Sequence, residues 1–224
     1  RRVMKKGYIL WDWNGTLLDD TDGAIETLND MLLKRSRPTI GKEFYRSRFS
    51  FPVKKFYTEI GVVLENEDWD ELAKEYHDVY ATKPKSLAKD AMDALESVAK
   101  AGWKQSIISA LRQDLLDQET ARFGVYDRME YVFGVDNLDG RSKVDRAKEL
   151  LSIIRTDEGE LSSGQVVLIG DSLHDASVAD ALGVSCVLYS NGTHSKERLE
   201  AVGTVCDTLV EAVGSAIEKI NRVS

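Results

Sequence analysis

The sequence has few cysteines and begins without a long apolar run. Its two cysteines, Cys186 and Cys206, lie in short apolar segments typical of strands, and no residues around them have metal-ligand spacing. We therefore expect buried, reduced thiols rather than a metal site. The N-terminal stretch RRVMKKGYIL is basic but precedes only a short apolar run, which predicts neither a signal peptide nor a transmembrane span. We expect a cytoplasmic protein with no membrane partner.

The sequence also lacks an excess of positive charge. It contains 30 Lys and Arg against 38 Asp and Glu, a formal net charge of -8. Such a chain is not attracted as a whole to nucleic acid phosphates or to an anionic membrane. Any phosphate binding must be local, through a metal ion or a few placed cations. The length of 224 residues with 42% hydrophobic content suits one compact domain, or a core domain with a smaller insertion, and we expect a monomer.

Short apolar runs alternate with segments of helical period, which predicts a parallel sheet covered by helices. The expected strands are residues 8–12, 105–109, 131–134, 166–170 and 185–189, with residues 205–206 left open as a short edge piece. From about residue 21 to 83 only helical periods occur, as in AIETLNDMLL and DWDELAKEYHDVY. We expect an α/β fold with a core domain of residues 1–20 and 84–224 and a small α-helical insertion at 21–83.

Polar residues stand where the expected strands end. Asp12 ends the first strand and Ser109 the second, Lys143 opens the helix after the third, and Asp171 and Asp175 follow the fourth. In an open parallel sheet, ligands bind beyond the carboxyl ends of the strands, near the point where strand order reverses. Each residue alone also fits a turn, capping or solvated role. Together they predict an oxygen-rich pocket with one cation, as a Mg²⁺ and phosphate site requires.

These residues occur in four short motifs. They are Asp12 with NGTLLD, Ser109 in SIISA, Lys143 in GRSKVDRAKELL, and GDSLHD at 170–175. The set resembles the motifs of the haloacid dehalogenase superfamily and, within it, the phosphoglycolate-phosphatase-like branch. The resemblance covers nearly the whole chain. Its first and fourth motifs are specific, whereas the Ser and Lys motifs are short and support the resemblance only by their position in the chain. It implies a Rossmann-like core with a helical cap inserted between the first and second motifs.

The resemblance implies a Mg²⁺-dependent phosphatase acting on a small phosphorylated metabolite. Asp12 would attack phosphorus to give an aspartyl-phosphate, while Ser109 and Lys143 would bind the phosphoryl oxygens. The implied metal ligands are Asp12, the backbone carbonyl of Asn14, Asp171 and Asp175, the last of which ligates the ion or orients its waters. Further candidates for substrate binding are Thr16, Ala110, Arg112 and Lys54.

Asn14 departs from the family pattern. Phosphatases of this superfamily carry a second Asp at this position, which protonates the leaving oxygen and then activates water. An amide cannot titrate, so a general acid/base contribution of ~10² to 10⁴ is missing there, although the metal site needs only the backbone carbonyl. Dehalogenase relatives also lack the second Asp, but they need no metal, and Asp171 and Asp175 argue against them.

Four explanations of Asn14 stay open. The protein is a phosphatase that is slow, uses a leaving group needing little protonation, or recruits His174. Alternatively, Asn14 is an engineered trap. In a third interpretation the protein is a phosphonatase-like hydrolase, with Lys54 or Lys55 forming an imine. The fourth is a non-catalytic protein that binds a metal and a phosphorylated ligand.

The segment RSRFSFPVKKFY is the expected lining of the cap, which closes over the site and excludes water. It mixes cationic residues with aromatic ones, namely Arg46, Arg48, Lys54, Phe49, Phe51 and Phe56. A cationic, aromatic lining suits a small anionic metabolite. The alternative is that these phenylalanines form the cap's own small core.

Overall fold

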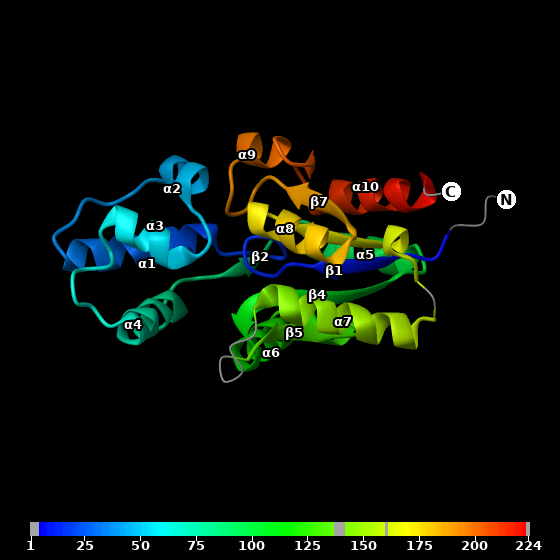
Figure 1. The fold of residues 1–224 in the computed structure, drawn as a ribbon, viewed down its shortest axis with the longest axis horizontal. Helices are drawn as coiled ribbons and strands as arrows, with labels where there is room; N and C mark the ends of the chain where they lie inside the picture. Colours follow the sequence, from blue (N-terminus) through cyan, green and yellow to red (C-terminus); the bar gives the residue numbers. More distant parts are fainter. Residues whose placement is uncertain (1–4, 137–141, 160, 223–224) are drawn as a thin grey trace.

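The computed structural model describes residues 5–136, 142–159 and 161–222, and its central feature is a six-stranded parallel sheet (Figure 1). The strand order is β5-β4-β1-β6-β7-β8. The strands are β1 (Tyr8–Trp11), β4 (Lys104–Arg112), β5 (Val132–Val135), β6 (Val166–Gly170), β7 (Ser185–Tyr189) and β8 (Thr204–Cys206). Strand order reverses at β1, which pairs with β4 on one side and β6 on the other. The predicted α/β class with a parallel core is confirmed.

Buried apolar residues explain why these segments form central strands. All residues of β1 (YILW) and β6 (VVLIG) are buried, as expected for parallel strands covered on both faces. Alternate residues of β1 enter different cores: Ile9 and Trp11 pack on one face, Tyr8 and Leu10 on the other. Strand β4 continues beyond its expected end at Ser109, because a register shift lets it pair with β5 as far as Arg112.

Helices cover both faces of the sheet. One face packs against α5 (Ala91–Lys100), α6 (Gln113–Arg122) and α10 (Leu209–Arg222), the other against α7 (Lys143–Asp157) and α8 (Leu173–Leu182). The short elements are α9 (Lys196–Glu200) and the 3-10 turns Tyr126–Arg128 and Ser163–Gln165. Within the described ranges, no helix is long and apolar enough to cross a membrane.

Four further helices lie together beyond one end of the sheet, at the left of Figure 1. They are α1 (Thr21–Lys34), α2 (Lys42–Arg48), α3 (Val53–Ile60) and α4 (Trp69–Ala81), and they share their own hydrophobic cluster around Leu28, Phe56 and Leu72. The chain enters and leaves this group through the antiparallel pair β2 (Leu18–Asp19) and β3 (Ser86–Leu87). The sequence does not reveal this pair, because two-residue strands are too short to show alternation. The division into a core and a cap of residues 21–83 remains a prediction.

The two cysteines are free thiols. Cys186 lies in β7 and Cys206 in β8, which confirms the edge strand left open at that position. Both side chains are partly rather than fully buried, because these strands lie toward the edge of the sheet.

Candidate active site

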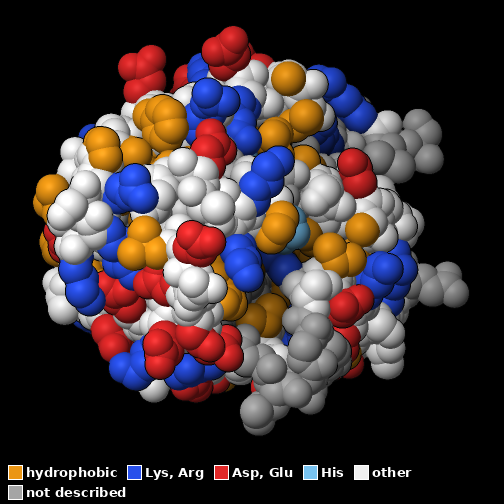
Figure 2. Space-filling model, turned by 60° about the vertical axis from the view of Figure 1, so that its left-hand side comes forward, with side chains coloured by type: hydrophobic (Ala, Val, Ile, Leu, Met, Phe, Trp, Pro, Cys, Tyr) orange, Lys and Arg blue, Asp and Glu red, His pale blue; other side chains and the backbone are white. Residues whose placement is uncertain are grey.

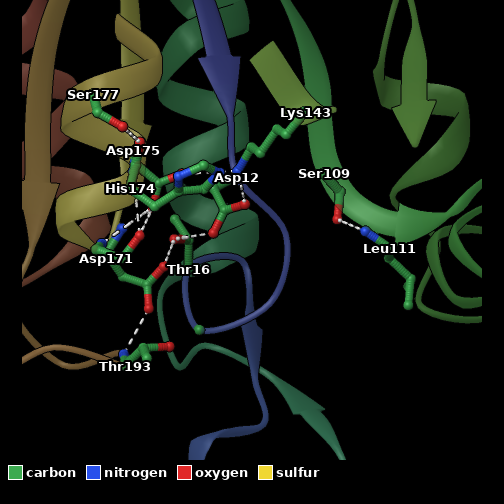
Figure 3. Close-up of polar contacts among 12 residues, drawn as sticks. Asp12, Thr16, Ser109, Leu111, Lys143, Asp171, His174, Asp175, Ser177 and Thr193 are labelled. Carbon is green, nitrogen blue, oxygen red and sulfur yellow. Dashed lines mark hydrogen bonds and ion pairs between the residues drawn. The ribbon is translucent and has the colours of Figure 1, made fainter. Parts of the chain in front are cut away.

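Three buried carboxylates meet beyond the carboxyl ends of β1 and β6 (Figure 3). Asp12 follows β1, Asp171 follows β6, and Asp175 lies in the first turn of α8. One oxygen of each lies within 4.8 Å of the others, and the three residues are only 7%, 1% and 1% exposed. Carboxylates this close and this buried need compensating cations.

Lys143, the first residue of α7, supplies one such cation. Its Nζ lies 2.6 Å from Oδ1 of Asp12 and 2.8 Å from Oδ1 of Asp175. Burial alone would lower the pKa of Lys143, but the charges of the two carboxylates outweigh it and raise the pKa above its usual range. For Asp175, burial opposes ionisation, yet the ammonium lowers its pKa overall. These pKa directions favour the charged form of the Lys143–Asp175 pair.

The second oxygen of Asp175 holds the start of α8 in place. It accepts hydrogen bonds from the backbone N–H of Asp171 and of Ser172 and from the Ser172 hydroxyl, at 3.0, 3.1 and 2.8 Å. Together with the return bond from the Asp175 N–H to Ser172 Oγ, this is a capping box. Asp175 has both oxygens engaged, so its geometry suits orienting the site more than direct contact with a ligand.

Asp12 and Asp171 face each other, and Lys143 pairs with Asp12 but not with Asp171. Thr16 Oγ1 lies 3.0 Å from Oδ1 of Asp171 and 3.3 Å from Oδ2 of Asp12, and the Thr193 N–H donates to Asp171 Oδ2 at 2.6 Å. Burial, followed by repulsion from the neighbouring carboxylates, raises the pKa of both Asp12 and Asp171. Hard, anionic oxygens with too little positive charge fit a divalent cation such as Mg²⁺.

Gly15 lets the loop after β1 approach this cluster. Its φ is +77°, and a Cβ placed there would lie 2.2 Å from Oδ2 of Asp171. Only glycine allows both the left-handed conformation and that close approach without strain. The Gly-Thr turn of the first motif therefore brings the β1 loop against Asp171.

A fourth buried carboxylate, Asp20, stands beside Asn14. It accepts hydrogen bonds from Asn14 Nδ2 at 2.9 Å, from the Gly15 N–H at 2.7 Å and from the Tyr80 hydroxyl at 2.5 Å. Burial raises its pKa. The sequence analysis missed Asp20; the available signal was a second acidic residue, after Asp19, at the entry to the helical insertion. The amide at position 14 and the carboxylate at position 20 are complementary hydrogen-bond partners.

The remaining predicted site residues divide into two groups. Ser109 and Ala110 line the same pocket as the carboxylates, and Ser109 Oγ accepts a hydrogen bond from the Leu111 N–H at 3.0 Å. Arg112 is exposed and pairs with Asp114, and Lys54 lies over the Trp69 ring, 5.5 Å from its centroid. Neither Arg112 nor Lys54 is among the described residues lining the pocket. Gly140 and Arg141 of the Lys143 motif lie outside the described residues.

The pocket has a volume of about 430 Å³, and its wall beyond the carboxylates is aromatic. Ring-bearing side chains from α2, α3, α4 and the α2–α3 loop line it, among them Tyr45, Phe49, Phe51, Tyr57, Trp69 and Tyr76. Figure 2 shows hydrophobic side chains and a histidine gathered near the middle of the face that the helical insertion presents. Phe56 is fully buried in the core of the insertion, as in the alternative interpretation.

The cationic residues expected in this wall lie elsewhere. Arg46 donates hydrogen bonds to the backbone carbonyls of Ser190, Gly192 and His194, in the loop after β7. Arg48 is exposed to solvent. Arg46 therefore joins α2 to the core rather than lining the pocket.

His174 lines the pocket but shows no sign of carrying a charge. Its ring stacks on Phe51 with centroids 4.8 Å apart. Burial lowers its pKa, and the nearby Lys143 ammonium lowers it further. A neutral imidazole is thus favoured at neutral pH.

Known proteins resemble this chain in sequence and in fold. The family model of haloacid dehalogenase-like hydrolases matches residues 9–189. A curated protein named "Probable phosphatase IndB", from Dickeya dadantii (strain 3937), is 22% identical in an alignment 223 residues long that covers 94% of this chain and 94% of the other.

Solved structures of similar fold cover almost the whole chain. A haloacid dehalogenase-like hydrolase from Streptococcus pneumoniae superposes with a TM-score of 0.76 at 16% identity, covering 93% of this chain and 97% of the other. A protein described as a predicted phosphoglycolate phosphatase from Haemophilus somnus gives a TM-score of 0.71 at 14% identity, with 93% and 97% covered. At these identities the likeness shows the fold.

Proposed function

The chain belongs to the haloacid dehalogenase-like hydrolase family, and we propose that it is a divalent-metal-dependent phosphatase that forms an aspartyl-phosphate at Asp12. The observation that carries this proposal is the buried cluster of Asp12, Asp171 and Asp175 with a single ammonium, Lys143, between two of them. The phosphatase name of the curated relative supports the reaction class. The substrate is a small phosphate monoester, since the pocket above Asp12 holds about 430 Å³.

The chemistry follows from the position of Asp12. A carboxylate oxygen of Asp12 attacks phosphorus, the bond between phosphorus and the leaving oxygen breaks, and that oxygen departs with the electron pair and takes a proton from water. Water then attacks the phosphorus of the aspartyl-phosphate and loses a proton, which releases inorganic phosphate and regenerates Asp12. Lys143 and the Ser109 hydroxyl bind phosphoryl oxygens in both steps.

A Mg²⁺ ion held by Asp12, Asp171 and the backbone carbonyl of Asn14 would neutralise the repulsion between the carboxylates and the phosphate. Asp175 keeps the turn that carries Asp171 in place through its capping box. The hydroxyl of Thr16 bridges the two facing carboxylates, within hydrogen-bond distance of both.

The environment of Asn14 bears on the explanations of this residue. Its amide donates to Asp20, a contact that an ionised Asp at position 14 cannot make, which supports Asn14 as an integral part of the site. Lys54 lies over Trp69 and outside the pocket lining, which argues against imine chemistry with this lysine. We therefore favour a phosphatase whose substrate needs little protonation of its leaving oxygen.

Phosphate release from a panel of small esters tests the proposal. The protein, Asp12→Asn and Asp12→Ala are assayed with Mg²⁺ and with chelator. We expect turnover by the parent protein alone, only with the metal. Turnover that persists in both Asp12 variants would refute the mechanism. Tight phosphate binding without turnover of any ester would favour the non-catalytic protein instead.

A further inference from the structure

The wall of the pocket is built from two sets of aromatic rings. In one set, Phe49 and Phe51 meet edge to face at 5.2 Å, and Phe51 stacks on His174. In the other set, Tyr76 stacks on Tyr80 with centroids 5.8 Å apart and an interplanar angle of 14°. These side chains line the same pocket as Asp12. A planar ring bound among them would gain ring contacts in addition to the burial of its apolar surface.

Charge in the pocket works against a substrate that carries another anionic group, such as a carboxylate, besides its phosphate. Among the described lining residues, Lys143 is the single Lys or Arg, and its ammonium is engaged by Asp12 and Asp175. Asp20 adds another carboxylate to the lining. A second negative charge on the substrate, such as a carboxylate, would be buried here without a cation, which is costly.

Asn14 places a second, independent restriction on the leaving group. Phosphoryl transfer has a loose transition state in which negative charge develops on the leaving oxygen. With an amide at position 14, no acid at the usual place protonates that oxygen. A phenol, with a pKa of about 10 as in tyrosine, leaves as a stable phenoxide and needs this help far less than an alkyl alcohol does.

We propose that the substrates are aryl phosphate monoesters, whose neutral aromatic ring lies among the rings of the pocket wall and departs as a phenoxide. This inference rests on the proposed phosphatase function and specifies its substrate class. In the first step the bond between phosphorus and the phenolic oxygen breaks, the phosphoryl group passes to Asp12, and the phenoxide takes its proton from water. The aromatic pocket wall and the Asn14 amide thus both restrict the leaving group of the substrate.

Four probes separate the preference for an aromatic ring from the preference for a good leaving group. Phenyl phosphate has both the ring and a good leaving group, and benzyl phosphate has the ring with an alkyl leaving oxygen. Acetyl phosphate has a good leaving group without a ring, and 2-phosphoglycolate has a carboxylate. Because general acid catalysis is worth ~10² to 10⁴, we expect kcat/KM for phenyl phosphate to exceed that for benzyl phosphate by at least about 100-fold. We expect kcat/KM for phenyl phosphate to exceed that for 2-phosphoglycolate by a similar or larger factor.

Ring variants test the binding part. In Phe51→Ala and Trp69→Ala, the KM for phenyl phosphate relative to that for acetyl phosphate should rise about tenfold, the loss expected for one aromatic contact. Phe44→Ala is the matched control: Phe44 is 39% exposed and Phe51 43%, yet Phe44 does not line the pocket. This control should leave the ratio unchanged.

The possible failures are distinguishable. If acetyl phosphate and 2-phosphoglycolate are hydrolysed in an Asp12-dependent way while phenyl phosphate is not preferred, the aryl proposal is refuted and the phosphatase stands. Equal rates for benzyl and phenyl phosphate would refute the leaving-group part and point to another proton donor, with Asp20→Asn as the variant to examine. If none of the four probes is hydrolysed, both proposals fail.

Discussion

The base and the wall of one pocket differ sharply in how they are held together. At the base, carboxylates, an ammonium and backbone N–H groups form a connected network, in which Asp175 alone makes one ion pair and accepts three further hydrogen bonds. At the wall, side chains such as Phe49, Phe51 and Tyr76 meet through ring faces and edges. Removing one charged partner at the base leaves another charge buried and unpaired, whereas removing a partly exposed ring such as Phe51 leaves no unpaired polar group.

This difference assigns separate tasks to the two regions. The fixed charges of the base suit the reaction at phosphorus, which every substrate shares. The apolar wall suits the choice of leaving group, which can vary with the rings that line it. Asn14 and Asp20 lie at the junction, where the hydroxyl of Tyr80 from α4 reaches Asp20.

The largest expected effect is the loss of Lys143, the one ammonium that the described residues place at the base. Lys143→Met leaves Asp12 and Asp175 buried without a cationic partner, so we expect the free energy of unfolding in urea to fall by about 3 to 5 kcal/mol. Added Mg²⁺ should recover part of this loss, because a divalent cation can compensate the same carboxylates. Lys148→Met, at an exposed position of the same helix, is the control. An equal loss of unfolding free energy in both variants would contradict the stabilising role of Lys143 between the carboxylates.

The next effect concerns His194, which stands between the two regions. Its Nδ1 accepts a hydrogen bond from the Leu173 N–H at 2.9 Å, and its ring lies near Phe49. Burial, reinforced by Arg198, lowers the pKa of His194 to about 4. The unfolded chain binds a proton below a pH of about 6.5 and the folded protein does not, so stability falls as the pH drops through this window.

Between pH 6.5 and pH 5, we expect His194 to lower the free energy of unfolding by about 2 kcal/mol. The span is about 1.5 pH units, at 1.36 kcal/mol each. The measurement is urea unfolding at both pH values for the protein and for His194→Asn, whose side-chain oxygen can still accept from Leu173. A variant with the same pH dependence as the parent would show that His194 is not responsible.

A smaller effect is expected from exchanging Asn14 and Asp20, which lie between the base and the wall of the pocket. Asn14→Asp alone sets two carboxylates in contact, since Asn14 Nδ2 now lies 2.9 Å from Asp20. The exchange Asn14→Asp with Asp20→Asn keeps one amide and one carboxylate, and moves the acid from position 20 to position 14, two residues after Asp12. We expect the exchanged protein to hydrolyse benzyl phosphate at least about tenfold faster than the parent. No gain for benzyl phosphate in a folded protein would show that Asn14 does not limit the rate.

The base was more predictable from the sequence than the wall. Asp12, Asp171 and Asp175 follow strands whose apolar runs are unmistakable, and parallel strands bring their carboxyl ends to one edge. Lys143 was predicted by its position at the start of a helix, and it does meet Asp12. Local pattern and sheet geometry together were sufficient there.

The wall of the pocket depends on contacts between residues far apart in the chain, which the local sequence pattern does not indicate. Nothing in the segment around Arg46 indicates that its guanidinium binds carbonyls of the loop after β7, more than a hundred residues later in the chain. Asp20 and Tyr80 meet across the helical insertion for the same reason, so neither was predicted as part of the site. Helical period indicates which face of a helix is apolar but not what that face packs against.

The central claim is that Asp12 accepts the phosphoryl group, and trapping the intermediate tests it most directly. Phenyl phosphate and Mg²⁺ are mixed with the protein, the reaction is quenched in acid within milliseconds to seconds, and the peptides are analysed by mass spectrometry. We predict one phosphoryl group on the peptide that contains Asp12, and none in Asp12→Asn or after addition of chelator. Hydrolysis of the ester with no phosphorylated Asp12 peptide at any quench time would contradict the account.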